Sequence, residues 1–507
     1  MRLLRTLVLI VFSFIVSVSL SAQDLEQLLE TLPNQEAFWT LTVLDESGNK
    51  LENFNSDKLI IPASNQKLYT LAAVLDRLGS DFKYTTNIYG DGELIDSTWQ
   101  GDLIIRGSGD PSISGFLYND DRYFVFKSYL EQLKEVGIAK IDGNLVGDER
   151  YFDSEVYPTG WDWYDLSFYY GVEIAPLSFN NNAVDIIVTA DGEVGDRPRV
   201  ESFPTSWPVE ISEEYPVDVF ERPTINLINN QEIVEPSKKY DEYYRRGLGS
   251  DRIVLASKLP QGYIEKESLS ILYAGSFFLE SFDAFLKNNG MKFQDYLSSH
   301  ELIGIDLLGQ NNFELETGLE YSEYELLASH SSKPLTELVK WANKESDNFY
   351  TEMMLKTLAA EEQGIPGTFE NGIKEVRNFL AEQGLDTNLV KMNDGSGLAM
   401  GNYTTTGNIS KLLYSMKSHE GWNVFYDSFP IAGIDGSIAH RFKGTELYNN
   451  IRAKTGYVSG VRTLSGYMTT RSGKQIVFSL ATNHFAGKVR PVDNSHQQIL
   501  QYLYEKY

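Results

Sequence analysis

The sequence predicts an α+β protein whose main domain, an antiparallel sheet with helices, is split by a large strand-rich insertion. Two observations support this prediction. Residues 23–81 and 326–507 combine helical periodicity with strand patterns. Residues 82–325 contain mostly short alternating runs, which Gly, Pro, Asn and Asp interrupt. With 507 residues, of which 42% are hydrophobic, the chain is long enough and apolar enough for more than one packed core.

Residues 1–22 have the pattern of a secretory signal peptide. Arg2 and Arg5 precede an apolar stretch at 7–18, and small residues lead up to Ala22, after which we expect cleavage. The alternative is an uncleaved membrane anchor, but the apolar stretch is short for the ~20 residues that a span needs. No later segment is apolar enough to span a bilayer. We therefore expect an exported protein with no stable membrane span after cleavage.

The remaining elements are predicted from their periodicity. A strand is expected at 36–46 and a helix from Ser64 onward, because apolar residues recur at 68, 71, 72 and 75. Within the insertion, strands are expected at 84–89, 103–106 and 184–188, a helix at 123–137, and a loop-rich stretch at 191–250. Helices at 334–344, 348–360, 368–383 and 493–506 then accompany strands at 451–456, 461–469 and 475–482.

Composition excludes several functional classes. The chain has 44 basic and 71 acidic residues, a formal charge of −27, which disfavours binding to nucleic acid or to an anionic membrane. It has no cysteine, so disulfides, thiolate metal sites and cysteine nucleophiles are excluded. Six scattered histidines without an HExxH motif give no metal site. We expect neither a metal nor another cofactor.

Three short motifs follow one another along the chain, and each also has an ordinary structural explanation. The first is S-x-x-K at Ser64 and Lys67, which lie on one face if the segment is helical. A serine hydroxyl becomes a good nucleophile when a base takes its proton, and a lysine with a lowered pKa is such a base. The alternative is a capped helix with a solvated lysine.

The second motif is S-x-N at Ser346 and Asn348, in a break between two predicted helices. There, a hydroxyl can pass a proton and a carboxamide can bind a peptide. The alternative is an ordinary helix cap.

The third motif is K-T-G at Lys454, Thr455 and Gly456, late in a predicted strand. A lysine beside a threonine hydroxyl suits a substrate carboxylate, and the glycine lets a ligand backbone approach the strand edge. The alternative is a strand that simply ends at glycine.

The order of these motifs resembles that of penicillin-binding proteins and serine β-lactamases. Further stretches resemble one family, the D-alanyl-D-alanine carboxypeptidase/endopeptidase family, which comprises the low-molecular-mass class C penicillin-binding proteins. The stretches that carry this resemblance are PASNQKL at 62–68, GSGDPS at 107–112, APLSFN at 175–180, DGSGL at 394–398, GIDGS at 433–437 and LSGY at 464–467. The resemblance runs from about residue 36 to 485.

The resemblance implies a serine DD-peptidase fold with two inserted modules, one nested near residues 109–178. It implies that Ser64 is the acylated nucleophile, Lys67 its base and Ser346 the proton relay to the leaving group. It also implies that Asn348 binds the substrate backbone, and that Lys454 and Thr455 hold the terminal carboxylate.

Under the same resemblance, the backbone N–H groups of Ser64 and Tyr457 form the oxyanion hole. The implied partners are peptidoglycan peptides and β-lactam antibiotics, and the implied location is the periplasm.

The sequence departs from the family pattern at two positions. Tyr457 follows K-T-G where the family usually has a small hydroxyl residue, and Met400 stands where an arginine is common. In the insertion, Asp165 resembles a position at which family members bind the amine of a diaminopimelate side chain. The alternative for Asp165 is an ordinary carboxylate on an acidic surface.

Three other functions remain open from the sequence. A β-lactamase would share the acylation residues but needs a residue that activates deacylating water, and the sequence identifies none. A non-catalytic wall-binding protein would not need Ser64, Lys67, Ser346, Asn348 and Lys454 intact. Other acyl-serine hydrolases, such as esterases, form the third alternative.

Overall fold

The computed structural model describes residues 25–204, 209–212, 225–238, 244–246, 252–298 and 321–507. Contacts divide the chain into two units. The first consists of Met1–Asp76, Val339–Asp347 and Val376–Tyr507, and the second of Arg77–Leu338 and Asn348–Glu375. The predicted signal peptide, residues 1–22, lies outside the described residues. In the described part of the chain, no helix combines the length and the apolar character needed to cross a membrane.

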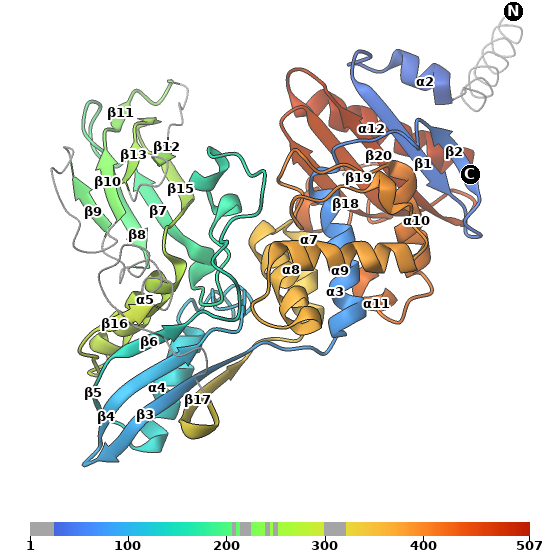
Figure 1. Ribbon diagram of the computed structural model, residues 1–507. Helices are drawn as coiled ribbons and strands as arrows, with labels where there is room; N and C mark the ends of the chain where they lie inside the picture. The colour runs from blue at the N-terminus through green and yellow to red at the C-terminus, as the bar shows by residue number, and fades with distance from the viewer. Residues whose placement is uncertain (1–24, 205–208, 213–224, 239–243, 247–251, 299–320) are drawn as a thin grey trace, which may run out of the picture. The chain divides into compact units, whose positions relative to one another are not determined.

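An antiparallel sheet forms the centre of the first unit (Figure 1). Its strand order is β18-β19-β20-β1-β2, so the C-terminal meander pairs with the N-terminal hairpin. The two hairpins are far apart in sequence and meet where β20 runs beside β1. The strands are β1 Phe38–Leu44, β2 Lys50–Phe54, β18 Ile451–Val458, β19 Val461–Thr469 and β20 Gln475–Asn483.

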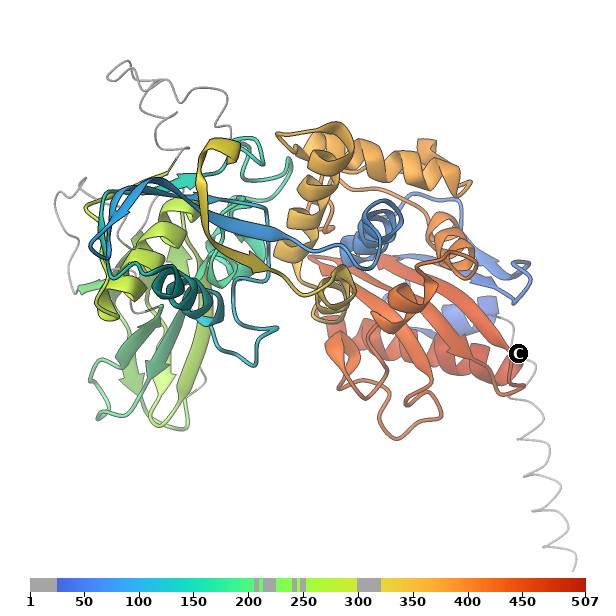
Figure 2. The ribbon, with the colours of Figure 1, turned by 90° about the horizontal axis from the view of Figure 1, so that it is seen from below.

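Helices cover both faces of this sheet, as Figure 2 shows. Alternate residues of a strand point to opposite faces. Leu41 packs in a buried cluster with Ile499 of helix α12 (Val489–Lys506), whereas the next residue, Thr42, has its hydroxyl 3.1 Å from that of Thr406 in α10 (Thr406–Met416). The sheet is therefore buried on both sides, which explains why β19 and β20 contain nearly continuous runs of buried residues.

The other helices in the N- and C-terminal parts of the chain are short to medium in length. The boundary between the two units falls within three of them, α3, α7 and α9. The helices are α2 Leu25–Thr31, α3 Lys67–Leu78, α7 Leu335–Lys344, α8 Asn348–Gln363, α9 Phe369–Glu382 and α11 Trp422–Asp427, with short 3₁₀ turns at η2 Ala63–Gln66, η7 Thr387–Leu389 and η8 Gly436–Ile438.

The second unit contains most of the strands. Its largest sheet has the order β16-β6-β4-β3-β17, with β5 paired to β4, and mixes parallel and antiparallel pairs. Smaller sheets have the orders β15-β7-β8, β12-β13-β10-β9 and β11-β14.

The bounds of these strands are β3 Thr85–Ile95, β4 Thr98–Arg106, β5 Lys140–Asp142, β6 Leu145–Asp148, β7 Ala183–Thr189, β8 Arg199–Phe203, β9 Val209–Ser212, β10 Ile225–Asn229, β11 Glu232–Val234, β12 Tyr244–Arg246, β13 Arg252–Leu255, β14 Lys258–Pro260, β15 Ile264–Ser270, β16 Tyr296–Ser298 and β17 Glu325–Ser331. The unit also has 3₁₀ turns at η3 Asp165–Ser167, η4 Tyr169–Gly171, η5 Asn180–Asn182 and η6 Tyr321–Glu323.

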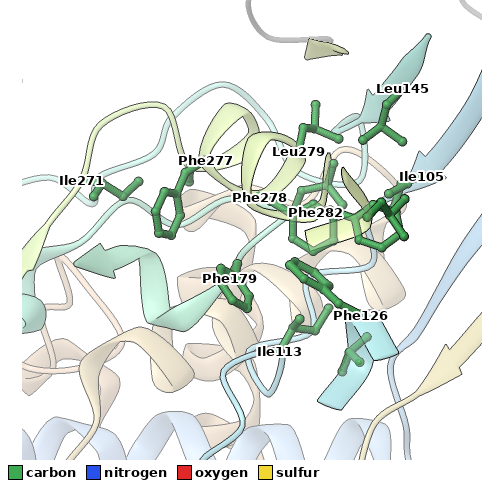
Figure 3. Packing of buried hydrophobic residues seen from close by; sticks show 14 of the residues in the cluster. Ile105, Ile113, Phe126, Leu145, Phe179, Ile271, Phe277, Phe278, Leu279 and Phe282 are labelled. Carbon is green, nitrogen blue, oxygen red and sulfur yellow. The ribbon is translucent and has the colours of Figure 1, made fainter. Parts of the chain in front are cut away.

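Two helices, α4 (Phe124–Val136) and α5 (Ala274–Asn288), supply the aromatic core of the second unit. Figure 3 shows Phe126 of α4 among Phe278 and Phe282 of α5, with Phe179 beside them. The Phe126 and Phe179 rings stack with their centroids 4.6 Å apart. Each of these rings is fully buried, so this cluster gives the insertion a hydrophobic core of its own.

The predicted α+β class is confirmed. Most predicted helices and strands are present within a few residues of their expected bounds. The structure differs in detail from two expectations. Ser64 lies in the 3₁₀ turn η2 and the α-helix begins only at Lys67, because contacts to distant segments hold the turn. The stretch 191–250, expected to be loop-rich, contains several short paired strands in its described part.

Candidate active site

Ser64 lies in the tight turn η2, directly before helix α3. Its side chain is partly exposed, whereas Asn65, Gln66 and Lys67 are fully buried. The predicted pair forms: the Lys67 Nζ atom lies 3.3 Å from the Ser64 Oγ atom. A nucleophile that reaches solvent beside a buried amine is the arrangement that lysine-assisted serine chemistry requires.

The residue before Ser64 has an unusual backbone. Ala63 has φ +47°, in the left-handed region, which costs a residue with a Cβ about 1–2 kcal/mol. Two glycines leave room for Ala63 in this conformation. A Cβ on Gly397 would lie 1.9 Å from the Ala63 carbonyl oxygen, and one on Gly456 would lie 3.0 Å from the Ala63 Cβ. The turn η2, which carries Ser64 and is called the nucleophile turn, is therefore packed between the DGSGL loop and strand β18.

The DGSGL loop also contacts Lys67. The Ser396 carbonyl accepts a hydrogen bond from Lys67 Nζ at 2.8 Å, and the neighbouring Gly395 carbonyl accepts one from the Thr70 hydroxyl at 2.8 Å. Two successive carbonyls thus hold one face of helix α3. The loop orients the amine that faces Ser64.

Asp394 holds this loop in shape. Its carboxylate is fully buried and accepts hydrogen bonds from the Gly397 N–H at 2.8 Å, the Ala399 N–H at 2.7 Å and the Asn402 amide at 2.7 Å. Charge-assisted bonds of this kind are stronger than neutral ones. The sequence analysis quoted Asp394 in a family stretch but assigned it no role.

Lys454 of the K-T-G motif lies behind the nucleophile turn. The Asn65 side-chain amide donates to the Lys454 carbonyl at 3.0 Å, which ties the turn to β18. The Lys454 side chain is fully buried, and its Nζ atom has no hydrogen-bond partner among the described residues. Burial, followed by the charges of Lys67 and Arg462, lowers the pKa of Lys454 well below its usual value, while Glu345 acts in the opposite direction.

Strand β18 is the edge strand of its sheet. The Ala453 N–H bonds outside the sheet, to the Pro430 carbonyl at 3.0 Å. The backbone N–H and C=O groups of successive residues point to opposite edges of a strand. Those of Thr455 and Tyr457 therefore face the same outer edge as those of Ala453. The Tyr457 side chain is 55% exposed. This half of the edge offers backbone N–H and C=O groups to an extended peptide.

Gly456 has a packing role that the sequence analysis did not predict. The expectation that this glycine lets a ligand backbone approach the strand stays a prediction. A Cβ at this position would lie 2.2 Å from the Thr463 hydroxyl oxygen and 2.8 Å from the Pro62 carbonyl oxygen. The glycine therefore makes room for the protein's own nucleophile turn.

Ser346 lies at the predicted break after helix α7. Its φ is +61°, and the Asp347 N–H donates to the Ala342 carbonyl at 3.0 Å, across six residues. This is the Schellman arrangement, in which a left-handed residue, usually glycine, ends the helix. The adjacent Glu345 lies close enough to Lys454 for the two charges to interact.

Asn348 and Asp165 belong to the second unit. Both contact Tyr170: the Asn348 side-chain amide donates to its carbonyl at 2.9 Å, and the Asp165 carboxylate is hydrogen-bonded to its hydroxyl. Burial, and then the charge of Asp162, raises the pKa of Asp165, whereas the bond to Tyr170 opposes this shift. The sequence analysis did not assign Tyr170, although the aromatic run at 161–170 marks the segment.

Within the first unit, the structure brings Ser64, Lys67, Lys454 and Thr455 together and adds the loop at 394–397. Met400, which stands at the position of the missing arginine, is 48% exposed. In the described part of the chain, no group of three His, Asp or Glu side chains is arranged to hold a metal ion.

The fold is that of the serine DD-peptidases. The same fold occurs in the crystal structure of penicillin binding protein 4 (dacB) from Haemophilus influenzae, with a TM-score of 0.76 at 24% identity over 95% of this chain and 100% of that one. A crystal structure of the same protein complexed with a β-lactam gives a TM-score of 0.72 at 22% identity, with the same coverage.

The chain belongs to the D-Ala-D-Ala carboxypeptidase 3 (S13) family, which matches residues 21–503. It is 27% identical over 483 residues to the D-alanyl-D-alanine carboxypeptidase DacB of Haemophilus influenzae, covering 94% of this chain and 92% of that protein. It is also 27% identical over 477 residues to the D-alanyl-D-alanine carboxypeptidase of Actinomadura sp., covering 92% of this chain and 81% of that protein.

Proposed function

We propose that this protein is an exported, serine-type D-Ala-D-Ala carboxypeptidase that acts on peptidoglycan peptides through an acyl-enzyme on Ser64. It would trim terminal D-alanine, open peptide cross-links as an endopeptidase, and be acylated by penicillin. The observation that carries the proposal is the distance of 3.3 Å between Lys67 Nζ and Ser64 Oγ in a buried setting. Family membership and the names of the relatives support the same activity.

Acylation would begin when Lys67 takes the proton of the Ser64 hydroxyl. Lys67 acts as this base in its neutral amine form, and its Nζ atom is positioned for the transfer by its hydrogen bond to the Ser396 carbonyl. The Ser64 oxygen attacks the carbonyl carbon of the penultimate D-alanine. The backbone N–H groups of Ser64 and Tyr457 would stabilise the oxyanion that forms.

Collapse of the tetrahedral intermediate breaks the peptide bond. The departing amine of the terminal residue takes a proton, which Ser346 would relay, and Asn348 would hold the substrate backbone. Lys454 and Thr455 would line the site that holds the terminal carboxylate. Water then hydrolyses the ester and releases the shortened peptide.

The alternatives on the same fold are a β-lactamase and a non-catalytic cell-wall-binding protein. The three motifs are complete, which argues against loss of catalysis. Neither the sequence nor the described site identifies a residue dedicated to activating water on a penicilloyl ester, which argues against a β-lactamase.

The central test is intact-protein mass spectrometry after incubation with penicillin. We expect the mass of the mature protein to rise by one penicilloyl group, and peptide mapping to place that group on Ser64. Ser64→Ala should give no adduct, and Lys67→Ala should form it at least a hundredfold more slowly, the scale of lost base catalysis. An unchanged mass at excess penicillin, or an adduct on another serine, would refute the proposal.

Export and the domain division remain predictions. The mature protein should begin at Gln23 if the signal peptide, residues 1–22, is cleaved where expected, and N-terminal sequencing of the exported protein checks this. The proposed main domain is residues 23–81 and 326–507, with residues 82–325 inserted.

Asp165 is proposed to select substrates that carry a diaminopimelate side chain, because its half-buried carboxylate suits an ammonium group. Asp165→Asn should lower kcat/KM on such peptides by tenfold to a hundredfold, about 1.4–2.7 kcal/mol, and change little on a short acylated D-Ala-D-Ala. Equal losses on both substrates would mean that the substitution damages the fold. No loss on either would leave Asp165 as a surface carboxylate.

A further inference from the structure

The Thr455 hydroxyl has a partner in the GIDGS stretch at 433–437, to which the sequence analysis assigned no role. Thr455 Oγ1 lies 2.8 Å from the Oγ atom of Ser437, which belongs to the short turn η8. The Thr455 side chain is buried, whereas Ser437 is exposed. The two hydroxyls therefore form a pair that runs from the K-T-G strand to the surface.

The direction of this hydrogen bond leaves one proton available. Thr455 donates to the Ser437 oxygen, and a hydroxyl carries one donor and two acceptor positions. Among the described residues, the Ser437 hydroxyl has no other hydrogen-bond partner, so its own proton remains free to bind a ligand. Accepting from Thr455 also makes Ser437 a stronger donor, because hydrogen bonds in a chain polarise one another.

Ser437 is held in place by the residues before it. The Asp435 carboxylate accepts from the Ile431 N–H at 2.8 Å and pairs with the Lys344 ammonium at 2.6 Å. Gly436 has φ +59°, and a Cβ there would lie 2.8 Å from the Lys344 carbonyl oxygen. A pre-positioned hydroxyl loses little entropy when it binds a ligand.

Two neighbouring groups allow an anion at this hydroxyl. Lys454, one residue from Thr455, carries a buried amine without a hydrogen-bond partner among the described residues. The nearest carboxylate along the chain, Asp435, is already paired with Lys344, which reduces its repulsion of an incoming anion.

We infer that Ser437 is a substrate-binding residue whose hydroxyl donates to the free carboxylate of the terminal D-amino acid, with Thr455 polarising it from behind. This inference rests on the proposed function, since it names a further contact for the same substrate.

The test compares two substrates that differ only at the terminal carboxylate. A short acylated peptide ending in D-Ala-D-Ala is used as the free acid and as the C-terminal amide, and kcat/KM is measured for both. The variants are Ser437→Ala, Ser437→Thr and, as a matched control, Ser472→Ala. Ser472 is an exposed serine whose hydroxyl likewise lies close to a threonine hydroxyl, that of Thr470 at 3.1 Å, in the turn between β19 and β20.

We expect Ser437→Ala to lower kcat/KM on the free acid by about tenfold to a hundredfold, the scale of a hydrogen bond to a charged group. It should change kcat/KM on the amide by less than about twofold. The ratio of kcat/KM for the acid to that for the amide should therefore fall by nearly the same factor as kcat/KM for the acid. Ser437→Thr should retain most of the preference, and Ser472→Ala should match the wild type. Thermal melting checks that each variant is folded.

Equal losses on acid and amide, or no loss on either, would overturn the inference while leaving the proposed function intact. A wild-type protein that is not acylated by penicillin would refute the proposed function itself. As a second measurement, Ser437→Ala should slow acylation by penicillin but not by its carboxylate methyl ester. Equal slowing of both reactions would also overturn the inference.

Discussion

At the scale of single residues, the nucleophile turn depends on the absence of side chains around it. Gly397 has φ +86°, and a Cβ there would overlap the Ala63 carbonyl at 1.9 Å, far inside any allowed contact. On the other side of the turn, a Cβ on Gly456 would lie 2.8 Å from the Pro62 carbonyl oxygen. These two positions explain how Ala63 keeps a left-handed backbone directly before Ser64: neighbouring segments pack against it from both sides.

Gly397→Ala should therefore slow acylation of Ser64 by penicillin at least tenfold, because the DGSGL loop must move away from the turn and take the Ser396 carbonyl with it. The chain offers a matched control in Gly473, which has the same φ of +86° but where an added Cβ would meet nothing within 4 Å. Gly473→Ala should cost about 1–2 kcal/mol of unfolding free energy from backbone strain alone and leave acylation unchanged.

Stopped-flow acylation and thermal unfolding of both variants provide the comparison. Equal acylation rates for Gly397→Ala and Gly473→Ala would show that the close approach to Ala63 does not position the nucleophile.

At the scale of elements, the second unit contains a buried polar cluster between the loop after β4, strand β17 and the segment before α4. The Asp110 carboxylate accepts from the Ser112 hydroxyl at 2.6 Å and N–H at 2.8 Å. Its other oxygen lies 3.8 Å from the His330 ring, which is 3.2 Å from the Tyr118 hydroxyl. Burial raises the pKa of Asp110 to about 6 and lowers that of His330 to about 4.

The raised pKa of Asp110 makes its contribution to stability depend on pH. A carboxyl group with a higher pKa in the folded state stabilises the protein fully below its unfolded value of 3.8, and this contribution is lost as the pH rises through about 6. Asp110→Asn removes this titration and keeps an oxygen for Ser112. The variant should gain about 1–2 kcal/mol relative to the wild type between pH 5 and pH 7.5.

Denaturant unfolding at the two pH values measures this difference. The pKa of His330 is shifted in the opposite direction to that of Asp110. Because His330 is present in both proteins, its contribution to the unfolding free energy cancels in the comparison. Asp185→Asn is the control, because Asp185 also accepts from a serine hydroxyl, that of Ser268 at 2.5 Å, but is only partly buried. A stability difference for Asp110→Asn that does not change with pH would contradict the prediction.

Elements were predictable where their pattern is local. Helix α4 and the three C-terminal strands follow from periodicity and tight turns, so short-range sequence is sufficient to define them. Helix α5 was not predicted, although it is strongly apolar, because Phe277, Phe278 and Phe282 face a core built from distant strands. The short parallel strands β9, β10 and β13 pair across long separations and have no local signature.

At the scale of the whole molecule, the formal charge of −27 makes like-charge repulsion a general destabilising term. Raising NaCl from about 10 mM to about 150 mM shortens the Debye length from about 30 Å to about 8 Å. We expect the melting temperature to rise by a few degrees over this range. An uncharged solute at equal osmolality is the control, and a melting temperature that falls with salt would mean that ion pairs outweigh the repulsion.

The sequence by itself determined the class of the fold, the strand-rich character of residues 82–325, the order of the three motifs and the pairing of Ser64 with Lys67, because these depend on composition, periodicity and spacing within one turn. Only the tertiary structure decided that Ser64 lies in a 3₁₀ turn, that Gly456 makes room for this turn, that the loop of Asp394 holds Lys67 and that Ser437 pairs with Thr455. These contacts join residues on separate elements, between 18 and 389 positions apart, and packing rather than local propensity sets their geometry.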